Sequence, residues 1–183
     1  MSMKGRLLFR VIENHPNDSR VKFREDDTFQ TLSGRMGTGG GNVPMVLEGE
    51  GKMDEVNTVV RRLTPLECER LQGFPDGWTD IGEWIDSKGK KHKDADSPRY
   101  KALGNSIALP FWQWMAERMT KVLKDDGVDN PTMASLFDGI GGFPLVYSRC
   151  GVVPIWASEV EEFCIAVTKR HFGEEKDDNT SEI

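Results

Sequence analysis

The sequence is poor in cysteine and contains no long apolar segment. It has three cysteines, at positions 68, 150 and 164, and they show neither a CxxC pair nor a spacing typical of metal ligands. A disulfide scaffold and a zinc site are therefore not expected. No apolar run approaches the length of a membrane span, and residues 1–10 lack the long apolar core of a signal peptide. We therefore expect a cytoplasmic protein.

The apolar content is low for a self-sufficient core. Apolar residues make up 37% and charged residues 30% of the 183 residues, which fits a soluble domain, or a domain and a fragment. The net charge of −6 argues against a purely basic nucleic-acid clamp. Positive charge is concentrated in residues 20–24, 61–62 and 88–93, and residues 173–183 form an acidic tail that we expect to be solvated.

The first 58 residues are rich in turn formers. Residues 27–32 alternate between polar and apolar, which predicts a half-exposed strand. Residues 43–47 predict a short edge strand, because Pro44 cannot donate a hydrogen bond in the centre of a sheet. The glycine-rich segment 37–42 either lets a partner approach the backbone closely or stays flexible.

Helical signals begin after Val59. Thr64, Pro65 and Glu67 match a capping box with proline in the first turn, which predicts a helix from about Pro65 to Leu71 that Gly73 ends. Residues 79–96 are expected to form a basic excursion on the surface, and residues 124–131 a linker. A second helix is predicted over residues 106–123, with one apolar face formed by Ile107, Phe111, Trp114, Met115, Met119 and Val122.

Residues 132–172 have a β-α-β-α pattern. The apolar periodicity predicts strands over 133–137 and 152–157, and helices over 142–150 and 160–171. Such a parallel pair is well buried only inside a larger, doubly wound sheet. Either the first half of the chain or another polypeptide must complete that sheet, and the first half offers few candidates for buried strands.

The segment Phe137-Asp-Gly-Ile-Gly-Gly-Phe143 lies between a predicted strand and a predicted helix. A glycine-rich turn in this position can bind a nucleotide-like ligand at the helix start, although a tight structural turn explains it equally well on its own. Glu159 ends the next strand, about twenty residues further on, where a carboxylate can accept hydrogen bonds from ribose hydroxyls. The alternative for Glu159 is a carboxylate that a helix N-terminus attracts.

Three blocks of the sequence resemble motifs of the DNA (cytosine-5) methyltransferases. They are residues 62–75, residues 99–108 and residues 135–143. In that family the glycine-rich block opens the catalytic domain and the other two close it, so the order is inverted here and is similar to a circularly permuted or split form of a phage-type member. The resemblance implies DNA methylation, as in restriction-modification, in a bacterial or phage-infected cell.

The resemblance also implies a fold and a division of the chain. The fold would be α/β, a partial Rossmann-like S-adenosylmethionine-dependent methyltransferase fold with a small irregular recognition segment. Residues 1–58 would end the target-recognition region, and residues 59–123 would carry the helical closing motifs. After the linker at 124–131, residues 132–172 would form the cofactor-binding unit, followed by the tail at 173–183.

S-adenosylmethionine is the cofactor that the resemblance implies. Phe137 would stack near the adenine, the glycines of the turn would face the methionine portion, and Glu159 would bind the ribose. Val160 stands where the family often has a larger side chain, and the closing-motif pair Asn105 and Ser106 would help complete the pocket, with helix capping as the alternative. The predicted cofactor-binding residues are Phe137, Asp138, Gly139, Ile140, Gly141, Gly142, Phe143, Glu159, Val160, Asn105 and Ser106.

Residues 30–44 resemble the end of the recognition region in phage-type members. The predicted contacts with double-stranded DNA are Arg35, Thr38, Gly39 and Arg62. Arg35 could reach phosphates or base edges, because the glycines after it allow close approach, and a solvated loop is the alternative.

The catalytic motifs of the family are missing from the sequence. Cytosine-5 transfer needs a thiolate that adds to the ring and an acid near N3, acting on a base rotated out of the duplex. The family supplies these with a Pro-Cys loop and a Glu-Asn-Val strand. The sequence has no Pro-Cys pair, and its one Glu-Asn pair, Glu13-Asn14, is followed by His15-Pro16 in a polar loop. Cys68 is expected to be a buried helix residue, and Cys150 and Cys164 likewise.

We therefore predict no catalytic residue in this chain. The resemblance implies a part or subunit of a DNA (cytosine-5) methyltransferase that is inactive without a second polypeptide carrying the Pro-Cys motif. The alternatives are a non-catalytic remnant that binds DNA or cofactor, and a truncated fragment of such an enzyme.

Overall fold

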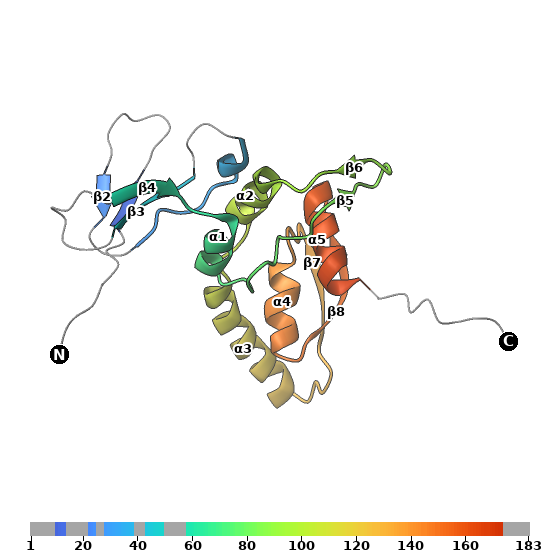
Figure 1. The fold of residues 1–183 in the computed structure, drawn as a ribbon. Coiled ribbons are helices and arrows are strands. Elements are labelled where there is room, and N and C mark those ends of the chain that lie inside the picture. Colours follow the sequence, from blue (N-terminus) through green and yellow to red (C-terminus); the bar gives the residue numbers. More distant parts are fainter. Residues whose placement is uncertain (1–9, 14–21, 25–27, 39–42, 50–57, 174–183) are drawn as a thin grey trace, which may run out of the picture. The chain divides into compact units, whose positions relative to one another are not determined.

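The computed structural model describes residues 10–13, 22–24, 28–38, 43–49 and 58–173 (Figure 1). The chain forms two compact units, each built from two segments. Residues 1–76 and 95–106 make the first unit, and residues 77–94 and 107–183 make the second. In the described residues no helix has the length and apolar character needed to cross a membrane.

The first unit contains an antiparallel sheet with the strand order β2-β1-β3-β4. Its strands are β1 (Arg10–Glu13), β2 (Lys22–Arg24), β3 (Met45–Gly49) and β4 (Thr58–Arg62). Val11 of β1 pairs with Val46 of β3, and both side chains are buried. The sequence had indicated only the region of β3, and the strands β1, β2 and β4 were not predicted.

Two strand predictions for this unit are wrong. The strand predicted at 43–47 exists as β3, but it lies between β1 and β4 and is not an edge strand. Pro44 directly precedes it, so the missing N–H is not needed in the ladder, and the Pro44 carbonyl accepts a hydrogen bond from Leu63 N at 2.9 Å. The strand predicted at 27–32 is not formed by residues 28–32. Residues 25–27, the polar loop of residues 14–20 and the tail beyond Gly173 lie outside the described residues.

A 3-10 helix, η1 (Gly34–Thr38), packs against the helix α2 (Asp96–Asn105). A Cβ atom on Gly37 would lie 2.5 Å from the Ser97 carbonyl oxygen and 2.6 Å from Lys101 Cβ. The Ser97 hydroxyl donates a hydrogen bond to the Gly37 carbonyl. Close packing within this unit therefore explains Gly37, the first residue of the predicted glycine loop, while residues 39–42 lie outside the described part.

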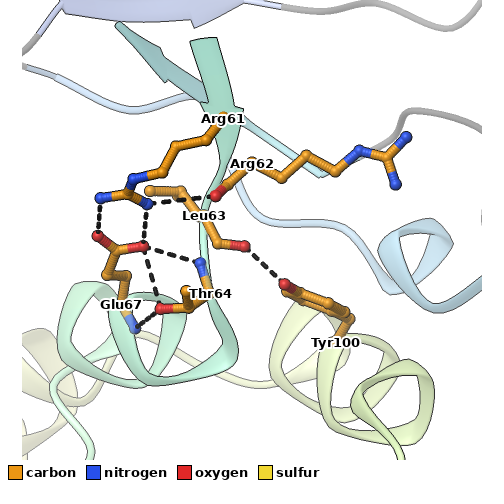
Figure 2. Close-up of polar contacts among 6 residues, drawn as sticks. All are labelled: Arg61, Arg62, Leu63, Thr64, Glu67 and Tyr100. Carbon is orange, nitrogen blue, oxygen red and sulfur yellow. Dashed lines mark hydrogen bonds and ion pairs between the residues drawn. The ribbon is translucent and has the colours of Figure 1, made fainter. Parts of the chain in front are cut away.

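The helix α1 (Pro65–Gln72) confirms the predicted capping box. The Thr64 hydroxyl accepts from Glu67 N at 3.3 Å, and a Glu67 carboxylate oxygen accepts from Thr64 N at 2.8 Å (Figure 2). Arg61 adds two hydrogen bonds to the same carboxylate, at 2.7 and 2.8 Å. Gly73, in the left-handed conformation at φ 82°, ends the helix as predicted.

Two side-chain bonds connect this capped helix and its approach to α2. The Tyr100 hydroxyl donates to the Leu63 carbonyl at 2.6 Å (Figure 2), and Gln72 Nε2 donates to the Leu103 carbonyl at 3.1 Å. The buried Glu69 carboxylate lies 3.4 Å from the Arg99 guanidinium. The first closing motif and residues 99–106 of the second therefore fold against each other in one unit.

The second unit holds the predicted β-α-β-α pattern. Its elements are β7 (Thr132–Leu136), α4 (Gly142–Arg149), β8 (Val153–Ser158) and α5 (Glu162–Phe172). The strands β7 and β8 are parallel, as expected, with Leu136 paired to Ser158 and a register shift between Met133 and Ala134. A hairpin of β5 (Trp84–Ile85) and β6 (Lys91–His92) completes the unit.

The helix predicted over 106–123 begins later than expected. The helix α2 ends at Asn105 with Ser106 as its C-cap, and α3 (Leu109–Asp125) starts afresh with Pro110 in its first turn. The expectation that Asn105 or Ser106 caps the start of a helix is therefore wrong. Ala108 at the N-cap has no side-chain acceptor, and Pro110 in the first turn, which has no N–H to satisfy, favours a helix start here.

The buried face of α3 also differs from the predicted one. Leu109, Ala116 and Thr120 are buried, and α3 packs against α4. Of the predicted apolar face, Phe111, Trp114, Met119 and Val122 are exposed. The periodicity located a helix but not which of its faces packs within this unit.

Glu67→Gln tests the Arg61–Glu67 interaction, because glutamine keeps the capping box and removes the charge. Hydrogen bonds from Arg61 lower the pKa of Glu67 from its usual 4.5 to about 2. This stabilisation is therefore complete above pH 4.5 and is lost as the pH falls through about 2. We expect the free energy of unfolding of the variant to be about 1 kcal/mol lower than that of the unmodified chain at pH 7, and the difference to disappear as the pH falls below about 2.

Urea denaturation at several pH values measures this difference. Glu83→Gln is the control, since Glu83 is an exposed carboxylate outside the capping box. A loss for Glu67→Gln that does not depend on pH would contradict the expected role of the charge.

Candidate functional site

The glycine-rich turn lies between β7 and α4, as the sequence predicts. Phe137 is the one non-glycine residue of the described chain with a positive φ, at 53°, and Gly139 and Gly141 follow at 58° and 79°. Asp138 N donates to the Ser158 carbonyl at 3.1 Å, which fastens the turn to the end of β8. Both strands therefore end at the turn, where their carboxyl ends meet.

The glycines of the turn have different roles. A Cβ on Gly141 would lie 2.7 Å from Phe172 Cε2, and one on Gly142 would lie 3.1 Å from the Ile107 side chain. A Cβ on Gly139 would meet nothing within 4 Å. Packing explains Gly141 and Gly142, whereas the backbone at Gly139 faces open space.

Glu159 follows β8 and bonds to the turn. Its carboxylate accepts hydrogen bonds from Gly139 N at 2.6 Å, Val160 N at 2.6 Å and Glu161 N at 2.9 Å. Burial acts to raise the pKa of Glu159, but these three backbone donors outweigh it and the pKa is lowered. Glu159 is therefore an ionised group that joins the turn to the segment before α5.

Asp138 and Ile140 point into the unit. The Ser135 hydroxyl donates to Asp138 Oδ1 at 2.6 Å, while Asp138 Oδ2 is buried without a partner in the described residues. Burial raises the pKa of Asp138, the Ser135 hydrogen bond opposes this, and the nearby charge of Glu159 adds to it. Asp138 therefore supports the turn from inside, in contrast to Phe137 and Val160, whose side chains are each 82% exposed.

The structure brings most of the predicted cofactor residues together. Residues 137–143, Glu159 and Val160 share one edge of the β7–β8 pair, and Phe143 packs edge-to-face on Trp112 at 4.8 Å between ring centres. Asn105 and Ser106 belong to the first unit, so their place in the pocket stays a prediction. A hollow of about 270 Å³ between β8 and α5 has Asp138 of the turn in its lining. Its other lining residues are Pro144, Pro154, Ile155, Trp156, Ala157, Thr168, Lys169, Phe172 and Gly173.

The predicted DNA contacts that the structure describes lie in the first unit. Arg35 and Thr38 are exposed on η1, where the Thr38 hydroxyl donates to the Arg35 carbonyl at 2.7 Å, and Gly39 lies outside the described residues. Arg62 is exposed at the end of β4. Figure 2 shows its guanidinium pointing away from the carboxylate that holds Arg61, so the two adjacent arginines differ in availability.

None of the three cysteines is placed to act as a nucleophile. Cys68 is fully buried in α1, and burial raises the pKa of its thiol to about 12. Cys164 is buried in α5, and Cys150 is half-buried after α4, with a pKa that burial also raises. The expectation for Cys68 is confirmed, since a nucleophilic cysteine must be a thiolate near neutral pH.

Residues 77–94 contact the elements of this site, a contribution that was not predicted from the sequence. Trp78 and Thr79 are buried, and the rest of the segment forms the β5–β6 hairpin against α5 (Figure 1). The lysines of the hairpin are exposed, so the expected basic surface exists. The two tryptophans at 78 and 84 were the available signal, because large aromatic side chains in a polar segment indicate packing.

A glycine-rich turn after a parallel strand, with a carboxylate at the end of the next strand, is the arrangement by which α/β proteins bind nucleotide-like ligands. Residues 11–121, more than half of the chain, match the model of the C-5 cytosine-specific DNA methylase family. The chain belongs to this family. The matched range includes both closing motifs and ends before the glycine-rich turn.

Several methyltransferases resemble parts of the chain. A DNA N-6-adenine-methyltransferase of Escherichia phage P1 is 44% identical over 35% of this chain and 11% of its own length. The Type II methyltransferase M.Bsp6I of Bacillus sp. (strain RFL6) is 33% identical over 55% of this chain and 26% of its own length. M.Sau3AI of Staphylococcus aureus is 33% identical over 44% of this chain and 16% of its own length. The chain spans about a quarter or less of these relatives.

The variants Gly141→Ala and Gly139→Ala compare a glycine of the turn that is packed against a side chain with one that faces open space. Both residues have positive φ, which costs alanine about 1 kcal/mol at either position. Only Gly141→Ala also brings a methyl group against Phe172. We expect a total loss of about 2–3 kcal/mol in unfolding free energy for Gly141→Ala and about 1 for Gly139→Ala, measured by urea denaturation. Equal losses would show that Phe172 does not restrict the turn.

Proposed function

We propose that the chain is part of a DNA (cytosine-5) methyltransferase that transfers a methyl group from S-adenosylmethionine to cytosine in double-stranded DNA. The family membership of residues 11–121 supports the class of reaction. The hydrogen bond between Gly139 and Glu159, at the shared end of two parallel strands, supports a cofactor half-site in the second unit. The second unit would be part of a Rossmann-like fold.

The residues of the turn fit the chemistry of S-adenosylmethionine. The exposed Phe137 ring offers a stacking surface for the adenine, and the open backbone at Gly139 lets a ligand lie against the main chain. Glu159 Oε2 accepts only one hydrogen bond from the described residues and so has room for a ribose hydroxyl. The bound cofactor would supply an electrophilic methyl group, and Asn105 and Ser106 would help close its pocket.

The chain's own residues bind and orient, and they do not form the covalent bond to cytosine. Addition of a thiolate to the ring requires a cysteine that ionises near neutral pH. The buried Cys68, with a pKa of about 12, cannot meet this requirement. The nucleophile would therefore come from a second polypeptide that carries the Pro-Cys motif.

The bare surface of the β7–β8 pair supports such a partner. Leu136, Ile155 and Trp156 are 63%, 66% and 53% exposed. Leu136 shares a sheet face with Trp156, because its neighbour Ala134 at i−2 pairs with Trp156. Purely parallel sheets are covered by helices on both faces, so this pair needs further strands and helices. The unmatched three-quarters of the relatives is of the size that could supply them.

The first unit would contact DNA. Residues 1–58 would form the end of a recognition region, with Arg35, Thr38, Gly39 and Arg62 facing the duplex. The exposed Arg62 guanidinium, adjacent to an arginine that is already paired, suits a phosphate contact.

A non-catalytic remnant that binds DNA or cofactor is the second candidate. It is favoured by the missing nucleophile and by the phage relative, which is named for adenine methylation although this chain covers 11% of it. The two candidates differ in one respect, since only the subunit gains methylation activity when a partner is supplied.

The methylation experiment uses tritiated S-adenosylmethionine and duplex DNA. We expect no transfer by the chain alone, and transfer when a methyltransferase fragment with a Pro-Cys loop is co-expressed with it. Leu136→Lys should remove at least nine-tenths of this transfer, because a buried lysine would face the added helices. Val122→Lys, at a similarly exposed apolar residue on α3, is the control and should keep it. Methyl transfer by the chain alone would refute the claim that the chain lacks a nucleophile. If no co-expressed fragment restores transfer, the non-catalytic remnant is favoured.

Arg62→Gln tests the DNA contact. We expect weaker binding to duplexes of any sequence, and a slope of log K against log salt that is smaller by about 1, because one phosphate contact is lost. Fluorescence anisotropy with labelled duplexes measures both. Arg70→Gln removes the same charge from an exposed arginine of the same unit that bonds to Asp76, and should leave the slope unchanged. Equal effects of the two variants would assign the change to net charge.

A further inference from the structure

Residues 77–94 contact both chain segments that form the candidate cofactor site. The first segment is the glycine-rich turn, and the second is the start of α5 directly after Glu159. All of these residues belong to one compact unit, although residues 77–94 lie far from the turn in the sequence. We call residues 77–94 the strap. This arrangement would allow the strap to fix the distance between the two segments.

The first contact is made by Trp78. Its indole Nε1 donates a hydrogen bond to the Ile140 carbonyl at 2.7 Å, and both residues are buried. Ile140 stands in the turn between Gly139, whose backbone is open, and Gly141. A buried indole N–H needs an acceptor, so this bond ties the position of the turn to that of the strap.

The Trp78 ring is itself fixed by the end of α5. It stacks on His171 with 3.6 Å between ring centres and 3° between planes, and the His171 imidazole hydrogen-bonds the Trp78 carbonyl at 2.8 Å. Phe172 meets the Trp78 ring edge-on at 6.0 Å. Phe172 is also the side chain that a Cβ on Gly141 would strike. The indole therefore has little freedom to follow a displaced turn.

The second contact is made by Ser87 at the other end of α5. The Ser87 hydroxyl donates to Glu162 Oε1 at 2.5 Å, and Ser87 N donates to Glu162 Oε2 at 2.9 Å. Both hydrogen bonds lower the pKa of Glu162. Glu162 is the first residue of α5, three residues after Glu159. Trp84 adds an edge-to-face contact with Phe163, with ring centres 5.6 Å apart.

The hairpin that presents Ser87 is braced internally. Trp84 stacks on His92 with ring centres 4.1 Å apart, and His92 Nε2 lies 2.9 Å from Asp86 Oδ2. The other oxygen of Asp86 accepts from Lys88 N and Lys90 N, at 3.0 and 2.9 Å. Ser87 is therefore carried on a rigid turn.

We propose that the strap positions the cofactor site, with Trp78 and Ser87 as positioning residues that act through Ile140 and Glu162. The proposal rests on the proposed function, since the ligand is S-adenosylmethionine. The bond from Gly139 N to Glu159 is where the two segments meet, and the strap holds each segment within three residues of that bond. Small displacements of binding groups are costly, so a site formed by two separate segments benefits from such a support.

Two conservative variants test the proposal. Trp78→Phe keeps an aromatic ring and removes the N–H donor, and Ser87→Ala removes one hydroxyl from an exposed residue. We expect each to raise the Kd for S-adenosylmethionine about tenfold in calorimetric titration, as the loss of one hydrogen bond predicts. In the double variant the Kd should rise by less than the product of the two single increases, because both residues act on the same pair of segments. Trp114→Phe and Ser148→Ala, exposed in the same unit, are the controls and should change nothing.

Amide hydrogen exchange gives a readout that does not need the cofactor. Trp78→Phe should speed exchange at the turn residues 139–142, and Ser87→Ala at Glu159 to Glu161, beyond any change in global stability. An unchanged Kd in both variants of a chain that binds S-adenosylmethionine would overturn the proposal. If the unmodified chain does not bind the cofactor, the proposed half-site fails, and the exchange rates alone decide whether the strap holds the two segments.

Discussion

Two parallel strands cannot cover their own faces, and this constraint governs the second unit. The helices α4 and α5 follow the two strands, yet Leu136, Ile155 and Trp156 remain mostly exposed. The carboxyl ends of the strands nevertheless carry a complete turn, in which Glu159 receives Gly139 N and two further amides. The turn at this edge is therefore built within this chain, while in the described residues its sheet has only the two strands β7 and β8. A site can be preformed locally and still depend on other strands for stability.

Local signals predicted those parts of the fold that depend on local interactions. The capping box at Thr64 and Glu67, the left-handed Gly73 and the β-α-β-α order all follow from spacings of a few residues, and the structure confirms them. The strands β1, β2 and β4 were missed because segments of three to five residues carry little periodicity, so only their pairing in the sheet identifies them. Pro44 led to the wrong prediction of an edge strand. The ladder begins one residue later, at Met45, so the missing N–H of Pro44 falls outside it.

The candidate site shows the same division. The positions of residues 137–143 and Glu159 at one strand edge could be predicted, because carboxyl ends of parallel strands meet. The inward direction of Asp138 could not, since it depends on the Ser135 hydroxyl and on burial. Adjacent arginines give a further example. Arg61 and Arg62 are both arginines, and only the geometry of the capped helix shows that Arg61 pairs with Glu67 while Arg62 is exposed.

The strap gives the inverted motif order a physical consequence. Residues 77–94 lie in the sequence between the two closing motifs, but they fold with the unit that carries the opening motif. The bonds from Trp78 to Ile140 and from Ser87 to Glu162 are therefore intramolecular in this chain. Covalent connection raises the effective concentration of such contacts far above what two free polypeptides would reach. In the proposed split enzyme, keeping both motif groups on one chain would preserve this support, and the proposed partner would be needed only at the exposed sheet.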